Sequence, residues 1–187
     1  MLDFLDFKTI SLIAHVFGAI IGAGGAFASD AMFFSTIKDG RITRQELRFM
    51  RLGGKLVWIG LGLLIISGIL LVLTNPDRYL TSDKFLAKLF IVGVIIVNGL
   101  IFHLIHIPHI RNHLGLKFSE SPTFAKKAPL LIASGVISMI SWIFTVVLGM
   151  LRNVPYNYLE IIGFYLIVSV LAITGANLMK KKILHLS

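Results

Sequence analysis

Residues 52–73 read LGGKLVWIGLGLLIISGILLVL, an apolar run in which Lys55 is the only charged residue. As a helix rising about 1.5 Å per residue, this run is long enough to cross the roughly 30 Å hydrocarbon layer of a bilayer. Four more apolar runs of similar character lie near residues 9–34, 85–107, 128–151 and 157–179. An open sheet would leave backbone groups unpaired in lipid, and the runs lack the alternation that barrel strands need. The sequence therefore predicts an all-α fold, an integral membrane bundle of five transmembrane helices.

The composition also favours a membrane protein over a soluble one. Of 187 residues, 56% are hydrophobic and 14% are charged, and the mean hydropathy is +0.87. The five runs leave little chain for a second domain, so we expect residues 1–187 to form a single transmembrane helical domain. The chain has no cysteine, which excludes disulfides, thiolate zinc sites, iron–sulfur clusters and covalent c-type haem.

The net charge of +9 gives an orientation in the membrane rather than a nucleic-acid partner, because the basic residues lie in short connections between apolar runs. The connections after the first and third runs and the C-terminal tail carry most of them: Lys38, Arg41, Arg44, Arg48, Arg51, Lys55, Arg111, Lys117, Lys126, Lys127, Lys180, Lys181 and Lys182. The other two connections hold little more than Arg78 and Arg152. The positive-inside rule therefore predicts an outer N-terminus and an inner C-terminus, in a multi-pass protein of the bacterial inner membrane.

An alternative for the first run is a cleaved signal peptide, since Ala26-Phe27-Ala28 before Ser29 fits a small-residue cleavage pattern. The run is long for such a segment. It also follows acidic residues rather than a basic n-region, which favours a spanning helix.

Within the polar stretch 38–51, the sequence predicts a helix that starts at Thr43. Thr43 with Glu46 three residues later is the pattern of a capping box, in which each side chain bonds the other residue's backbone N–H. We expect a short helix here, with Leu47, Phe49 and Met50 dipping into the membrane interface and the arginines meeting anionic lipid headgroups.

Ionisable residues inside the runs indicate function, because each is costly in hydrocarbon unless it is paired, protonated or ligated. Helix rise places His15 of the first run and Lys88 of the third at similar depth near the outer face. By the same arithmetic, Asp30 lies near the inner face, level with His103 and His106. The sequence thus predicts two polar sites, one near each face.

The outer site is a candidate for b-type haem with His15 as an iron ligand. His15 and His103 differ in depth by about 18 Å, whereas the two axial nitrogens of one haem are about 4 Å apart, which disfavours a shared bis-histidine haem. The axial position opposite His15 would then be empty or filled by another group, for example Met150 or Lys88.

Gly18 and Gly22 follow His15 at helical spacing and would leave a shallow trough for a planar cofactor beside the imidazole. The alternative is helix packing, because Ala14, Gly18, Gly22 and Ala26 form a small-xxx-small series that by itself predicts only the close approach of another helix.

The inner site allows three interpretations. His103 and His106 share a helix face, and with a carboxylate oxygen from Asp30 they make a common ligand set for a divalent metal, which would be a second metal ion. The same residues suit a proton relay, and they also suit a purely structural role.

Four segments resemble a superfamily of small bacterial membrane proteins that includes the HemJ-type protoporphyrinogen oxidases and the CopD-type copper-resistance domains. These segments are the His15 helix, Arg44-Gln45-Glu46-Leu47-Arg48-Phe49-Met50-Arg51, Ser67-Gly68-Ile69-Leu70-Leu71 and Leu86-Ala87-Lys88-Leu89. The resemblance implies that His15 binds b-type haem and that Lys88 is required for catalysis. It does not explain the fifth run or the inner histidines.

These observations predict a haem-binding membrane oxidoreductase that acts in electron transfer or oxidises a membrane-soluble substrate such as a quinone or a porphyrin. Membrane lipid and a second copy of the chain, in a homo-oligomer, are the expected partners. The alternative is a transition-metal or proton transporter that uses Asp30, His103 and His106. A third interpretation is a purely structural subunit of a larger complex.

The charge asymmetry can be tested by cysteine labelling, since the natural chain offers no competing thiol. We expect a membrane-impermeant thiol reagent to label Asp77→Cys in intact cells and to leave Lys117→Cys unlabelled until the cells are opened. The reverse labelling pattern would show that the predicted orientation is inverted.

Overall fold

The computed structural model describes residues 6–37, 41–116 and 121–178. In those ranges every regular element is a helix, in the order α1 (Phe7–Ile37), α2 (Arg44–Thr74), α3 (Pro76–Leu80), α4 (Asp83–Ile101), η1 (Phe102–His106), α5 (Ile107–Arg111), α6 (Pro122–Met150) and α7 (Tyr158–Leu178). The element η1 is one turn of π-helix, which joins α4 and α5 into one continuous rod.

Five rods are long and apolar enough to cross a membrane: α1, α2, the α4–η1–α5 rod, α6 and α7. The predicted all-α fold with five helices of spanning length is therefore confirmed, and it is compatible with a multi-pass membrane protein. The orientation stays a prediction. The last predicted residue of the fifth span, at 179, and the charges at Lys38, Lys117 and the C-terminal lysines lie outside the described residues.

The start of α2 differs from the sequence prediction. Thr43 does form the capping box, since its backbone N–H donates to Glu46 Oε2 at 2.7 Å and its hydroxyl accepts from the Glu46 N–H at 3.3 Å. The helix that begins there is not short, however, but continues without a break to Thr74. Leu47 and Met50 are buried inside the bundle instead of lying at its interface, because their face continues the one that packs against the other helices.

The tightest contact in the bundle is between the backbones of α1 and α2. A Cβ added at Gly60 would lie 2.6 Å from the Gly18 carbonyl oxygen, and one added at Gly18 would lie 2.7 Å from the Leu64 nitrogen. Further along the same pair, a Cβ at Gly53 would lie 2.8 Å from the Gly25 oxygen. Contacts below 3 Å leave no room for a side chain, so glycine is required at this interface.

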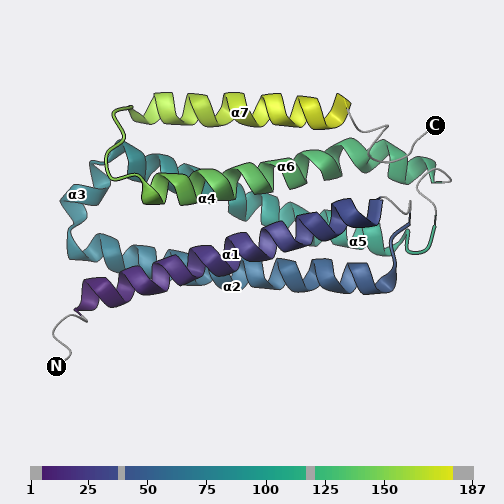
Figure 1. Ribbon diagram of the computed structural model, residues 1–187, viewed down its shortest axis with the longest axis horizontal. Helices are drawn as coiled ribbons and strands as arrows, with labels where there is room; N and C mark the ends of the chain where they lie inside the picture. The colour runs from purple at the N-terminus through teal and green to yellow at the C-terminus, as the bar shows by residue number, and fades with distance from the viewer. Residues whose placement is uncertain (1–5, 38–40, 117–120, 179–187) are drawn as a thin grey trace.

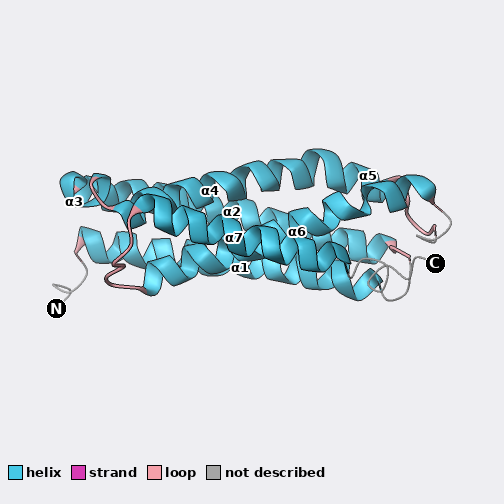
Figure 2. Cartoon of the chain, turned by 90° about the horizontal axis from the view of Figure 1, so that it is seen from above, coloured by secondary structure: helices cyan, strands magenta, loops and turns pink. Residues whose placement is uncertain are grey.

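The α1–α2 pair forms one edge of the bundle, with α4 and α6 next to it and α7 at the far edge, as Figure 1 shows, and Figure 2 gives the view from above. Helix α6 contacts both α1 and α4, and α7 packs along α6 and α4 at the edge of the bundle. Large aliphatic side chains remain exposed on the outer faces, for example Ile66 on α2 and Leu171 on α7. A surface of this kind is that of a protein surrounded by hydrocarbon.

The α1–α2 contact predicts opposite effects for two glycines of one helix. We expect Gly60→Ala to lower the free energy of unfolding by about 1–3 kcal/mol, because the new methyl group overlaps the α1 backbone. A Cβ at Gly62 has no neighbour within 4 Å in the structure, so Gly62→Ala should be neutral or stabilising by up to about 1 kcal/mol. Thermal unfolding of the purified protein in detergent measures both, and equal effects would contradict the packing.

Candidate functional site

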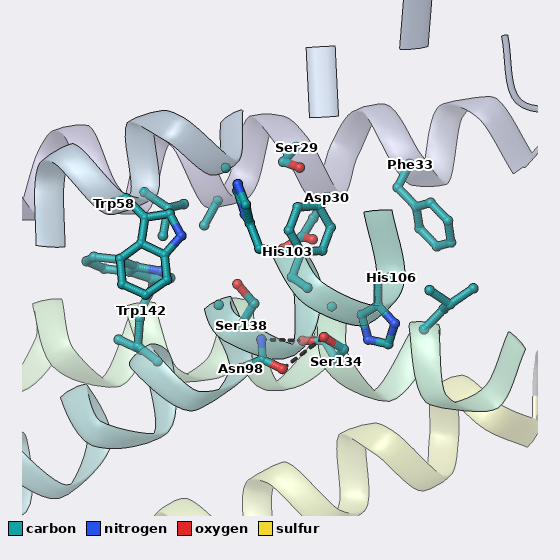
Figure 3. Close-up of a pocket in the computed structure, with 18 of the residues that line it drawn as sticks. Ser29, Asp30, Phe33, Trp58, Asn98, His103, His106, Ser134, Ser138 and Trp142 are labelled. Atoms are coloured by element: carbon teal, nitrogen blue, oxygen red, sulfur yellow. Dashed lines mark hydrogen bonds between the residues drawn. The ribbon is translucent and has the colours of Figure 1, made fainter. Parts of the chain in front are cut away.

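A polar cavity lies between α1, α2, the η1 turn and α6, and Figure 3 shows the side chains that surround it. Its polar lining consists of Ser29, Asp30, Asn98, His103, His106, Ser134 and Ser138. The space open to water-sized molecules is about 60 Å³, which is room for a few waters. Indoles of Trp58 and Trp142 close one end, and His103 is exposed at the bundle surface.

Asp30 is the least compensated charge in this cavity. Its Oδ2 is buried and accepts no hydrogen bond from any described residue. The carboxylate lies against Gly135 of α6, where an added Cβ would meet Asp30 Oδ1 at an ordinary contact distance of 3.6 Å. A carboxylate buried without a partner is costly while it is charged, so this one needs a proton or a cation.

The two cavity histidines come from a distorted turn of the third spanning rod. In η1 the Ile107 N–H donates to the Phe102 carbonyl, five residues back instead of four. Pro108 follows directly, and because proline has no N–H it cannot donate to a carbonyl in the preceding turn. We attribute the π-turn to this proline. The turn places both His103 and His106 on the cavity lining.

His106 is 3% exposed, and its Nε2 has no hydrogen-bond partner among the described residues. Its ring meets Phe102 edge to face at 6.5 Å between centroids. On the opposite side of the cavity, His103 lies against α2, with its Cε1 3.2 Å from the position of a Gly54 Cβ. One imidazole is thus enclosed, whereas the other reaches the surface.

The structure brings Asp30, His103 and His106 to one cavity, at the common depth that helix rise predicts. Across the described residues, however, no group of three His, Asp or Glu side chains is arranged to hold one metal ion. A metal shared by these three residues would need their side chains to move. A proton relay has no such requirement, because water can connect donors and acceptors that do not touch.

Sequence reasoning missed a row of hydroxyl groups that leaves the cavity along α6. Its members are Ser134, Ser138, Ser141 and Thr145, spaced by four, three and four residues and therefore on one helix face. Ser141 lies 2.8 Å from the Tyr165 hydroxyl of α7 and is fully buried. At the cavity end, Ser134 and Asn98 form a reciprocal pair of hydrogen bonds between α6 and α4, at 2.8 and 3.0 Å. The spacing was the signal that could have revealed this row.

The row ends close to Lys88. Its Nζ is 3.7 Å from the position of a Gly149 Cβ, one turn beyond Thr145 on α6. Lys88 also interacts electrostatically with His15, in keeping with the similar depth that helix rise predicts for them. The hydroxyl row therefore lies along the α6 face between the cavity and the Lys88 end.

His15 forms a separate site between α1 and α2. Its Nδ1 lies 3.1 Å from Ser67 Oγ, and the Ser67 hydroxyl donates to the Leu63 carbonyl at 2.6 Å. The tautomer with hydrogen on Nδ1 satisfies both contacts, because the Ser67 hydroxyl can then donate to the carbonyl and accept from the imidazole. In that tautomer Nε2 keeps the lone pair that a ligand would use.

The glycine trough expected beside His15 is filled by protein. The Gly18 face packs on the α2 backbone, and a Cβ at Gly22 would overlap the Trp142 ring. Met150, an expected axial group, is 79% exposed at the end of α6. Helix packing, the alternative raised for this small-residue series, accounts for both glycines.

The structure also supports the separation of His15 from His103. Gly68 borders the His15 ring and Gly54 borders His103, and these glycines are about four turns apart on α2, or about 21 Å. The two histidines therefore do not share a haem.

The chain matches no protein-family model, no curated protein and no solved structure. The likeness to HemJ-type and CopD-type proteins consequently rests on short motifs around His15 and Lys88. The function must be argued from the Asp30 cavity and the His15–Ser67 pair themselves.

Proposed function

We propose that the protein transfers protons across a membrane through the Asp30 cavity. The observation that carries this proposal is Asp30, a half-buried residue that lines the cavity and whose Oδ2 is buried without a hydrogen-bond partner among the described residues. A bound proton removes the charge that hydrocarbon disfavours. Imidazoles both accept and donate protons, so His103 and His106 suit exchange with this carboxylate.

Different groups would carry the proton on the two sides of Asp30. His103 reaches the bundle surface and can exchange protons with the aqueous side nearest the α1–α2 connection. Beyond Asp30, successive hydroxyls of the α6 row are about 6 Å apart along the helix axis where they are four residues apart. One water can bridge each such gap with two hydrogen bonds of about 2.8 Å. The Lys88 amine lies at the far end and would accept or release the proton there.

A transition metal is the competing cargo for the same cavity. A shared metal would need Asp30, His103 and His106 to move together, since these described residues are not arranged around one ion. Metal transport would be favoured if liposomes containing the protein took up a divalent cation but no protons.

Asp30→Asn tests the proton proposal, because asparagine keeps the size of aspartate but cannot carry the proton. In liposomes with an internal pH dye and an imposed potential, we expect the natural chain to accelerate proton uptake. Asp30→Asn should lower the rate at least tenfold, while Asp30→Glu should keep part of it. Asp77→Asn, at a surface carboxylate of α3, is the matched control and should be unchanged.

Coupling within the cavity provides a second readout for the same prediction. Either Asp30→Asn or His103→Ala should already interrupt the path, so the double variant should lose little more than the worse single one. The proposal would be contradicted if the two single losses added up in the double variant. It would also be contradicted if the natural chain took up protons no faster than protein-free liposomes. Circular dichroism of each variant confirms that loss of transfer is not loss of fold.

A second candidate function is b-type haem binding at His15, with electron transfer or oxidation of a quinone or porphyrin in the bacterial inner membrane. The observation that favours it is the Nδ1 contact with Ser67, which orients the ring and leaves Nε2 as a donor. The Nε2 lone pair of His15 suits an iron ligand. The trough expected at Gly18 and Gly22 is, however, occupied by α2 and Trp142. A bound haem would supply one-electron chemistry near Lys88.

The colour of the purified protein tests this candidate. If His15 ligates haem, the protein should show a Soret band that His15→Ala abolishes, with helicity unchanged. His113→Ala is the control, because that histidine bonds the His109 carbonyl and Thr123 at the other end of the bundle. A colourless natural protein, or a band that survives His15→Ala, would remove His15 as a ligand.

A further inference from the structure

The outward face of α2 changes character once along its length. Arg44, Arg48, Arg51 and Lys55 follow one another at intervals of four, three and four residues and share one exposed stripe. The same stripe continues with Ile59, Ile66, Ile69 and Leu73, whose exposed fractions lie between 56% and 66%. Gly62 falls between them and has open space around it. The face therefore carries positive charge for three turns and aliphatic surface for the next four.

The cations occupy the level at which lipid headgroups would lie. Residues 56–74, the part of α2 beyond the last cation, span about 28 Å as a helix, close to the thickness of a hydrocarbon layer. The stripe from Arg44 to Lys55 extends beyond that length. It faces away from the bundle, because the intervening Met50, Gly53 and Gly54 are the buried side of the same turns.

Within the described residues, no ion pair joins these four cations to a carboxylate, and Glu46 of the same helix bonds Thr43. Phe49 and Leu52 lie beside the cations on the same exposed surface of α2. An anion that carries an acyl chain can pair with the cations and cover these apolar side chains at the same time.

We propose that this face of α2 is a binding site for an anionic phospholipid. The phosphate lies among Arg48, Arg51 and Lys55, where guanidinium groups can bond it bidentately. One acyl chain lies along the stripe of Ile59, Ile66 and Leu73. The occupant is a lipid and not a free phosphate, because the aliphatic half of the stripe continues directly from the charged half and a free anion would leave it uncovered.

Binding to the full chain in detergent tests the site, using phosphatidylglycerol and phosphatidylcholine of identical acyl chains, with retained lipid counted by native mass spectrometry. We expect phosphatidylglycerol to bind more tightly. Each cation near a headgroup phosphate should contribute about fivefold, so Arg48→Gln/Arg51→Gln should weaken binding roughly thirtyfold. The control Arg78→Gln/Arg152→Gln removes the same charge at the opposite end of the bundle and should leave binding unchanged.

Three results would overturn the proposal: equal affinity for the two lipids, equal weakening by both double variants, or competition by inorganic phosphate at the concentration at which phosphatidylglycerol binds. The substituted side chains are exposed, so the variants should keep their helicity. The result is independent of proton transfer, since none of the four positions lines the Asp30 cavity.

Discussion

The backbone contact between α1 and α2 fixes the positions of both candidate sites. With Gly18 and Gly25 seated on α2, neither helix can slide along the other without placing a side chain against a backbone. This register sets His15 against Ser67 at one end of α2 and brings Ser29 within 3.4 Å of the Met50 carbonyl at the other. Asp30, the next residue, is thereby held at the cavity. The positions of two polar groups in an apolar bundle thus depend on glycine–backbone contacts that contain no polar side chain.

The rest of the bundle compensates polar groups to different degrees. Asn98 and Ser134 satisfy each other across α4 and α6, and Ser141 is satisfied by Tyr165 and its own helix. Three side chains that line the cavity, Asp30, His106 and Trp142, each keep a buried polar atom without a hydrogen-bond partner among the described residues. A buried unpaired group costs free energy, and the paired neighbours show that pairing is attainable in this bundle, so unpaired atoms gathered at one cavity favour function over structure.

Fixed helix geometry explains which features the sequence could predict. Rise per residue alone separates His15 from His103 and brings Asp30 level with the inner histidines, because an apolar run in lipid must be a helix. The side chains that pack against a glycine-rich helix face come from other helices, so the sequence of the glycine helix does not reveal them. The Gly22 surface receives Trp142 from a helix more than a hundred residues later, and only tertiary structure shows it. The π-turn likewise depends on how the rod accommodates Pro108.

Helix α2 connects the cavity with the proposed lipid site. Gly54 contacts His103 on the inner side of the helix, whereas Lys55 is exposed on the outer side. One helix diameter of about 10 Å separates the two faces. Under the two proposals, proton exchange at His103 and lipid binding beside Lys55 therefore take place on opposite faces of the same turn of α2, so one side of this helix can be altered without touching the other.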